Sequence, residues 1–465
     1  MGVVYAQLAS ADARTHPSVR QDRRFIDRAF AFSCFALLLA ANVSLFAPHV
    51  GGAPVRSILS AGTLVLSVAL FPTDAMVVLR KSALILALAA GLAVEGSFVS
   101  FVNGAHVGDV VQQVIEVHVQ TAVVLLATGI LARVCGPRPC VIAIVAVVGV
   151  SAIFAILQMM HVEAAWSIRQ ALGPLATDEN SVNLVDHRPT GLSFSPIWLA
   201  TQICLAFAAF AAVRDKERQS FPGTSSIDPF LIIGLGVFLL TCLASGTRAP
   251  ILGGFIFLIM YAALRRSWSL VLLVIGGMLL MYILLPLIVE AVQNTSPRVM
   301  VTDDNSAAAR IVFAYYGMRL FLANPLGYGL TFDPTLMWGK YWPDLYLMKG
   351  AAGAQVHPLH DYALSMLNIY GVGLILFVPI IVRLLKKSGR SLLFFIPYIV
   401  HISFHNSGPF YNDMILWFAI AAIAATPCAA ASGQGRVVRA VARSPLSRRA
   451  RPTRGAAQSP GFAVR

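Results

Sequence analysis

Long uninterrupted apolar runs recur along the chain, and they restrict its fold more than any other feature of the sequence. Runs of roughly 18 to 22 residues are long enough to cross a bilayer as helices. They are continuous rather than alternating with period two, which favours helices over a closed β-barrel. Of the 465 residues, 57% are hydrophobic and only 12% are charged, which argues against a set of water-soluble domains. The sequence therefore predicts an all-α polytopic membrane protein.

About twelve membrane-spanning helices are expected, with both termini in the cytoplasm. Their approximate ranges are 29–47, 58–71, 82–101, 110–132, 141–160, 196–213, 229–245, 250–264, 270–289, 362–382, 391–404 and 410–426. Basic clusters fall in the turns that this topology assigns to the cytoplasm, as the positive-inside rule requires. Arg80 and Lys81, for example, are expected in the turn between the second and third helices.

Five segments follow from this topology. They are a cytoplasmic N-terminal segment (1–28), nine helices (29–289), a large extracytoplasmic loop (290–360), three helices (361–428) and a basic cytoplasmic tail (429–465). The net charge of +14 lies largely in the tail and the short turns, so no nucleic-acid partner is expected. Contact of the tail with anionic membrane lipids and a merely solvated tail are both possible.

The cysteine pattern gives no sign of a metal or disulfide framework. All six cysteines lie in or beside predicted spans or on the cytoplasmic side, and none lies in the large loop. No zinc-type spacing is present, and we expect neither a metal nor a cofactor.

Three arginines lie on the predicted outer side, against the usual trend for basic residues. Arg188 lies in a polar loop at 161–195, Arg248 in the tight turn after the seventh span, and Arg310 in the large loop. Each could cap a helix, pair with a local acid or reach lipid head groups. Because guanidinium forks suit phosphate and all three share one side, a diphosphate ligand is the sharper hypothesis.

The segment 306–322 is predicted to be a helix that lies against the membrane surface or the mouth of the bundle. Arg310 and Arg319 are nine residues apart, so at about 100 degrees per residue they point to opposite sides. Only one of them can face a shared site, and Arg310 is favoured.

A histidine pair precedes the tenth span. Pro358 suits the first position of that helix, which would place His360 in the first turn, where the dipole favours a neutral base. Asp361 could orient the ring or shift its pKa, and both readings stay open. A histidine at a membrane interface is usually a hydrogen-bonded anchor, and His357 with His360 gives only two ligands for a metal.

Other ionisable groups fall inside predicted spans. Glu95, Glu116 and His118 could form an ion path, but pairing with one another is the preferred reading. His401 and His405 would share a helix face and could line the same outer cavity; packing is an equal alternative.

The order of these motifs resembles the O-antigen ligase and polymerase superfamily of bacterial inner membranes. The resemblance runs from Arg188-x-x-Gly191 through Ser245-x-x-Arg248, Arg310, Asn324-Pro325-Leu326-Gly327-Tyr328-Gly329 and His360-Asp361 to Gly371-Val372-Gly373-Leu374. Ala249, Asp361 and Ala314 depart from the usual family pattern.

The resemblance implies a metal-independent, inverting glycosyltransferase with a helical fold like that of the C-type glycosyltransferases. It would transfer a glycan from an undecaprenyl diphosphate carrier to an acceptor hydroxyl on lipid A core or a growing polysaccharide, at the periplasmic side of the inner membrane. By similarity His360 is the catalytic base, Arg248 and Arg310 hold the diphosphate, Arg188 is a further diphosphate ligand, and His357 and Asp361 are accessory. The alternatives are a twelve-helix secondary transporter and a non-catalytic subunit of polysaccharide assembly.

Overall fold

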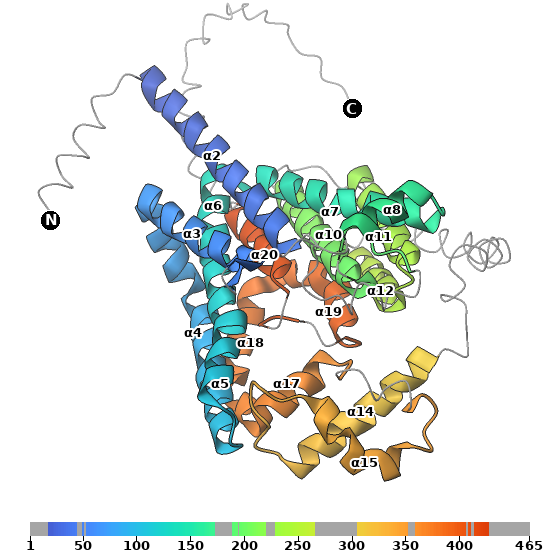
Figure 1. The fold of residues 1–465 in the computed structure, drawn as a ribbon. Helices are drawn as coiled ribbons and strands as arrows, with labels where there is room; N and C mark the ends of the chain where they lie inside the picture. The colour runs from blue at the N-terminus through green and yellow to red at the C-terminus, as the bar shows by residue number, and fades with distance from the viewer. Residues whose placement is uncertain are drawn as a thin grey trace, which may run out of the picture. The chain divides into compact units, whose positions relative to one another are not determined.

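The fold comes from a computed structural model of the whole chain, and it is mostly helical (Figure 1). The structure describes residues 17–43, 49–50, 53–172, 188–193, 195–219, 228–265, 305–351, 359–405, 408–410 and 413–426. The predicted ninth span (270–289), the basic tail and His357 lie outside the described residues.

Helices account for almost all of the regular structure in the described ranges. Before residue 200 they are α2 (Pro17–Val43), α3 (Val55–Leu70), α4 (Pro72–Val102), α5 (Val107–Gln113), the π-helix η1 (Val114–Val119), α6 (Gln120–Cys135), α7 (Pro137–Met159), α8 (Glu163–Leu172) and the start of α10 (Pro196–Gln219). Two antiparallel strands of two residues each, β1 (His49–Val50) and β2 (Ala53–Pro54), precede α3.

The later elements are shorter. They are α11 (Pro229–Ala244), α12 (Arg248–Arg265), α14 (Asn305–Ala323), η4 (Pro334–Met337), α15 (Trp338–Leu345), α17 (Tyr362–Tyr370), η5 (Gly371–Phe377), α18 (Val378–Ser388), η6 (Gly389–Phe395), α19 (Ile396–Ile402) and α20 (Ile415–Ala425). The predicted helix over 306–322 is confirmed and begins at Asn305.

Seven helical stretches within the described ranges are long and apolar enough to cross a membrane. They are 24–43, 72–102, 107–135, 137–159, 196–218, 248–265 and 362–402, and shorter apolar helices lie at 55–70, 229–244 and 415–425. Their outer surfaces carry exposed aliphatic and aromatic side chains, such as Val94 at 71% and Phe98 at 64% exposure. These helices indicate an all-α protein that is embedded in a membrane.

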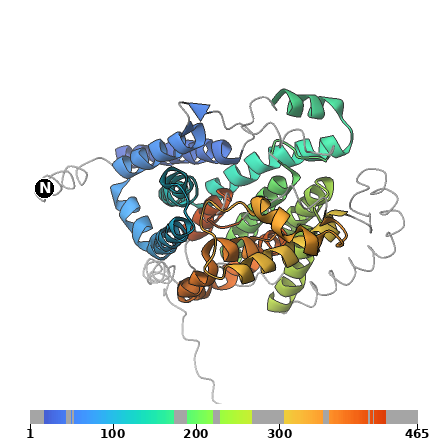
Figure 2. The ribbon, with the colours of Figure 1, turned by 60° about the horizontal axis from the view of Figure 1, so that its bottom comes forward.

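The centre of the bundle is formed by α20, the last described helix. It packs against α6, α7 and α10, and α2 packs against α6 and α7 from the other side. In Figure 2 the red helix lies among cyan and green ones, which matches these contacts. Phe418 and Ala419 are fully buried in this core, and Phe35 of α2 meets Phe418 edge-on at a ring-centroid distance of 5.3 Å.

Two expectations about the spans need correction. Arg80 and Lys81 lie inside α4 rather than in a turn, because Phe71 alone joins α3 to α4 and Pro72 starts the next helix at once. The predicted span 362–382 is interrupted at Gly371, whose φ of +60° cannot continue an α-helix.

The interruption at Gly371 makes room for the loop that follows α14. Val372 donates its backbone N–H to the carbonyl of Pro325 at 2.8 Å, and Tyr328 donates to the carbonyl of Asn368 at 2.7 Å. A Cβ on Gly371 would lie 2.2 Å from the carbonyl carbon of Leu326. The glycine is therefore required for close backbone packing between this loop and α17.

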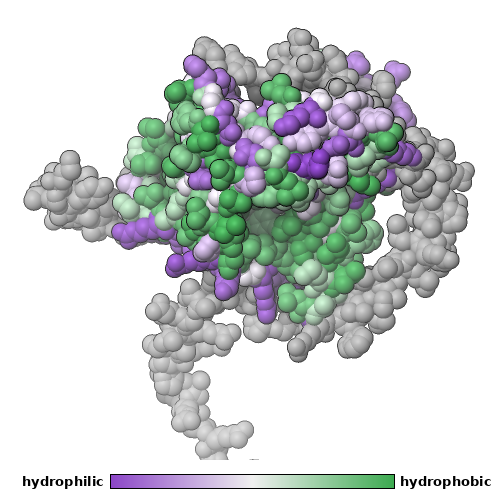
Figure 3. Space-filling model, turned by 90° about the horizontal axis from the view of Figure 1, so that it is seen from below, coloured by the Kyte–Doolittle hydropathy of each residue, from purple (hydrophilic) through white to green (hydrophobic). Residues whose placement is uncertain are grey.

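A second, smaller hydrophobic core lies under the described part of the large loop. It joins α14 and α15, with Tyr316 meeting Trp338 and Tyr341 edge-on. Seen from below, the surface of the described residues is largely hydrophobic at the centre of the view, with hydrophilic residues toward the top and at the lower left (Figure 3). Because α14 also packs on α17, this small core fixes the loop helix at one end of the bundle.

The two ends of the bundle carry different chemistry. Where α6, α10 and α12 end and α7 and α11 begin, the charged side chains form ion pairs, namely Arg133 with Asp74, Arg138 with Glu217, Arg214 and Arg218 with Asp228, and Arg265 with Asp215. We call this the ion-pair end. Where α11 ends and α12 begins, at the opposite end of those helices, lies the candidate site.

Candidate functional site

The candidate site is built around His405, just after the last turn of α19. Its ring centroid lies 4.3 Å from that of His401 and 6.3 Å from that of His360. Both His401 and His405 are buried, at 0% and 2% exposure. The two rings are in contact, as expected, but the predicted shared helix face is wrong, because α19 ends at Ile402 and His405 follows it.

His360 is placed by the helix of the large loop. Its ring stacks on Phe313 of α14 with centroids 4.8 Å apart and planes 16° apart. Phe313 is buried in the loop core and lies one helical turn after Arg310, so that the two side chains share a face of α14. Phe313 is a positioning residue that the sequence analysis did not identify, since its apolar character predicted only packing.

The expected place of His360 in the first turn of a helix is wrong. Helix α17 begins at Tyr362, and the carboxylate of Asp361 accepts a hydrogen bond of 3.0 Å from the backbone N–H of Leu364. Asp361 is thus the N-cap of α17, as its side chain and extended backbone favour. His360 precedes the cap, in the segment between α15 and α17.

Arg310 reaches the same group of histidines. Its guanidinium carbon lies 5.8 Å from the ring centre of Phe404, the residue before His405. Arg319, nine residues later, forms an ion pair with Asp344 at 2.6 Å on the outer surface of α14. The two arginines therefore have different surroundings, and Arg310 is the one beside the histidines.

Arg188 is bound to the turn that carries Arg248. Its Nη2 atom donates hydrogen bonds to the carbonyl oxygens of Ser245, at 2.8 Å, and Gly246, at 3.2 Å. These carbonyls lie at the C-terminal end of α11, where the helix dipole favours a cation. Arg188 and the tight turn before α12 thus form one unit.

The loop that holds Arg188 is fixed by buried polar side chains. Gln158 Oε1 accepts hydrogen bonds of 2.9 Å from the backbone N–H groups of both Thr190 and Gly191. Ser151 Oγ accepts from Leu192 N at 3.0 Å, and Arg169 donates to Thr190 Oγ1 at 3.0 Å. A loop with its backbone groups satisfied in this way presents Arg188 in one defined position.

Arg248, the first residue of α12, is placed by the packing of α12 on α19. Phe394 contacts Phe257 and Tyr261 near the end of α12, while a Cβ on Gly253 would lie 2.6 Å from Pro397. Residues nearer the end of α12 therefore contact the segment just before α19, and earlier residues of α12 contact α19 itself, so the two helices run antiparallel. The start of α12 consequently lies at the level of the end of α19, where His401 and His405 are.

Burial and the neighbouring groups of the site shift the pKa of His405. Burial, followed by His401, Arg310, His360 and Arg188, lowers the pKa of His405 well below the ordinary histidine value. His405 is therefore neutral near pH 7, with one ring nitrogen as donor and the other as acceptor. Arg188, Arg310 and His360 therefore all influence the charge of one imidazole, and the His360 ring lies 6.3 Å from it.

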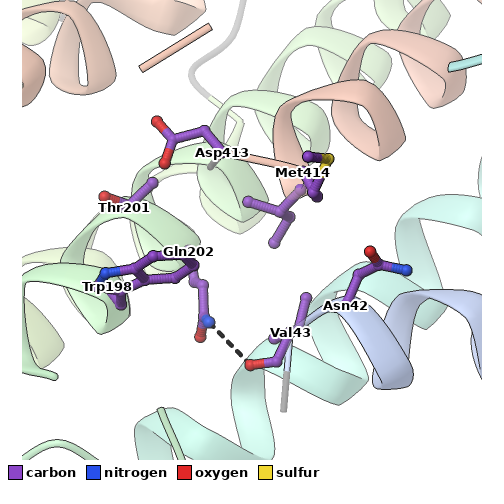
Figure 4. A pocket seen from close by; sticks show the side chains of 8 residues that line it. Asn42, Val43, Trp198, Thr201, Gln202, Asp413 and Met414 are labelled. Atoms are coloured by element: carbon purple, nitrogen blue, oxygen red, sulfur yellow. Dashed lines mark hydrogen bonds between the residues drawn. The ribbon is translucent and has the colours of Figure 1, made fainter. Parts of the chain in front are cut away.

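A small pocket lies between α2, α10 and α20. Its lining includes Asn42, Thr201, Gln202 and Asp413, with Gln202 donating to the carbonyl of Val43 at 3.0 Å (Figure 4). Thr201 Oγ1 lies 3.0 Å from His401 Nε2. Thr201 therefore both lines the pocket and contacts His401.

The ionisable groups inside the membrane stretches have other partners. His118 Nε2 lies 3.2 Å from the hydroxyl of Tyr370, and Glu116 accepts from Gln112 at 2.9 Å. In the described ranges no hydrogen bond joins Glu95, Glu116 and His118, so the preferred reading of mutual pairing is wrong. Across those same ranges, no three His, Cys, Asp or Glu side chains come close enough to hold a metal ion.

Comparison with protein-family models, curated proteins and solved structures gives no match to this chain in any of the three. The fold and the site define its class alone: a mostly helical, membrane-embedded protein with arginine and histidine side chains gathered at one end of its helices.

Proposed function

We propose that the chain is a membrane glycosyltransferase of the O-antigen ligase and polymerase kind, which transfers a glycan from an undecaprenyl diphosphate carrier to an acceptor hydroxyl. In this proposal the protein has twelve spans, both termini are cytoplasmic, and the large loop and the site face the periplasm of the bacterial inner membrane. The observation that carries it is the convergence of Arg188, Arg310 and His360 around the buried His405.

The topology in this proposal is supported by the two ends of the bundle. Acidic and basic residues of the ion-pair end belong to the short turns that the positive-inside rule assigns to the cytoplasm. The site lies at the opposite end of α11 and α12, which the same rule assigns to the periplasm. A sugar donor there must carry its own activation, and a lipid diphosphate link does so.

The chemistry is a single displacement at the anomeric carbon. The acceptor oxygen attacks sugar C1 as the bond from C1 to the diphosphate oxygen breaks, and that electron pair leaves with the diphosphate. His360 takes the hydroxyl proton as general base. Arg310 and Arg248 stabilise the negative charge that develops on the leaving diphosphate, and the anomeric configuration is inverted.

Phe313 and Arg188 have supporting roles in this mechanism. Stacking on Phe313 limits the orientations of the His360 ring, so its nitrogen meets the acceptor hydroxyl in a defined direction. The bonds from Arg188 to the carbonyls of Ser245 and Gly246 hold the turn from which Arg248 projects.

The deciding experiment is reconstitution of the purified protein in liposomes with a lipid-diphosphate-linked glycan and candidate acceptors. His360→Ala should lower transfer by about 10²- to 10⁴-fold, the usual contribution of a general base. The matched control is His161→Asn, an exposed position with φ of +57° that asparagine tolerates. Full transfer by His360→Ala would disprove the catalytic assignment, and substrate flux without transfer would favour a transporter instead.

A further inference from the structure

His405 is a buried imidazole whose own hydrogen bonds are unmade within the described ranges. Its side chain is 2% exposed, and neither Nδ1 nor Nε2 has a hydrogen-bond partner there. Buried polar atoms in folded proteins nearly always have a partner, since leaving one unsatisfied costs about 1–3 kcal/mol. The two nitrogens therefore point to a group that joins the site from outside the chain.

The neighbour of His405 is held in place differently. His401 Nε2 lies 3.0 Å from Thr201 Oγ1 and 3.3 Å from the carbonyl oxygen of Ile197, so its ring is fixed to α10. Because a backbone carbonyl can only accept, a hydrogen bond to it requires the proton on Nε2 of His401. A fixed His401 packs on one side of His405 and limits how that ring can turn.

Two guanidinium groups act on His405. Arg310 and Arg188 come from different segments, and each lowers the pKa of His405 electrostatically. A hydrogen-bond donor among guanidinium groups is suited to an anionic acceptor, because the anion's oxygens can accept from all of them at once.

We propose that His405 is a further diphosphate contact, donating a ring N–H to a phosphoryl oxygen of the carrier headgroup beside Arg310 and Arg188. This inference rests on the proposed function, and it adds a binding residue from α19 to the arginines and the base. It also explains why a histidine rather than a phenylalanine occupies this buried position. His405 is thus a binding group for the leaving diphosphate, whereas His360 handles the acceptor proton.

The test is binding of geranylgeranyl diphosphate to the full-length protein in detergent, with geranylgeraniol as the uncharged counterpart. His405→Phe keeps a planar ring and removes both nitrogens, so its affinity for the diphosphate should fall about tenfold or more. Its affinity for the alcohol should stay unchanged, which a merely structural defect would not produce. His405→Asn and His405→Gln place an amide donor near Nδ1 or Nε2, and one of them should recover most of the affinity.

The outcomes separate this inference from the proposed function. If the wild-type protein binds the diphosphate no better than the alcohol, the diphosphate site and the proposed function fail together. A different outcome overturns only the role of His405: the wild type prefers the diphosphate, Arg310→Ala loses that preference, and His405→Phe keeps it. Should His405→Phe fail to fold, the two amide variants decide, because loss of diphosphate preference in both would also overturn the donor role.

Discussion

Arg188 donates a hydrogen bond of 2.8 Å to the carbonyl oxygen of Ser245, and this bond joins the polar loop before α10 to the turn between α11 and α12. The same Nη2 atom also reaches Gly246 at 3.2 Å. Because Arg248 follows this turn as the first residue of α12, the position of its backbone depends on the bonds from Arg188. A change at Arg188 should therefore affect transfer even where it does not touch substrate.

Arg188→Lys tests this dependence. The lysine keeps the charge, but its single ammonium cannot reproduce the position of the planar guanidinium, so transfer should fall about tenfold or more. The control is Arg138→Lys at the ion-pair end, where the side chain of Arg138 is 71% exposed and transfer should not change. Equal transfer rates in liposomes for both variants would show that the turn holds its shape without Arg188.

Gln158 is expected to stabilise the Arg188 loop. Gln158→Leu leaves two buried backbone N–H groups, those of Thr190 and Gly191, without their acceptor. At about 1–3 kcal/mol for each unsatisfied group, the free energy of unfolding should fall by about 2–6 kcal/mol.

Denaturant unfolding in micelles measures the effect of Gln158→Leu. Gln158→Glu keeps an acceptor and should lose less stability. Gln112→Leu removes an exposed bond to Glu116 and should change stability by about 0.5 kcal/mol or less. A similar loss in Gln112→Leu and Gln158→Leu would contradict the structural role of the loop contacts.

Hydropathy predicts the helices of this chain because a bilayer selects segments by length and apolarity alone. The ranges expected at 141–160, 229–245 and 250–264 correspond to α7, α11 and α12, and Gly246, with its positive φ, lies in the expected tight turn before Arg248. The short amphipathic α8 was predicted only as part of a polar loop, since ten residues with mixed polarity carry no membrane signal. Local chemistry also decided the start of α17, where an aspartate cap replaced the expected proline start.

The candidate site was only partly predictable. Sequence position alone suggests a common site for four ionisable residues, because all of them fall on the predicted outer side of the membrane: Arg188, Arg248, Arg310 and His360. Gln158, Phe313 and His405 act through contacts between distant segments, and such contacts leave no periodic signal in one sequence. His405 was identified only as a neighbour of His401, with packing and cavity lining as equal alternatives.

The lowered pKa of His405 predicts a loss of stability in acid. As the pH falls below about 6.5, the unfolded chain binds a proton at this residue while the folded protein does not. The free energy of unfolding should then fall by up to about 1.4 kcal/mol per pH unit on account of this group, until the folded pKa is reached.

His405→Gln removes the titrating group and should flatten this dependence. The measurement is thermal unfolding of the wild type and of His405→Gln at about pH 7.5 and about pH 5. His161→Asn, which removes an exposed histidine, should keep the wild-type slope. Identical slopes for the wild type and His405→Gln would show that His405 is not held neutral by the folded protein.

Arg310 and Arg319 offer a matched pair on one helix, because they lie on opposite sides of α14. Arg319 pairs with Asp344 where the two side chains are 47% and 45% exposed, so Arg319→Ala should cost no more than about 1 kcal/mol of stability and leave transfer intact. Arg310→Ala should lower transfer by about tenfold or more, since a charge-assisted bond to the leaving diphosphate is lost. Arg310→Lys separates charge from shape: a rate between those of the wild type and Arg310→Ala indicates that the guanidinium fork matters beyond its charge. Measured in the same liposomes, equal rates for Arg310→Ala and Arg319→Ala would remove Arg310 from the site, because the two variants differ only in which side of α14 loses its cation.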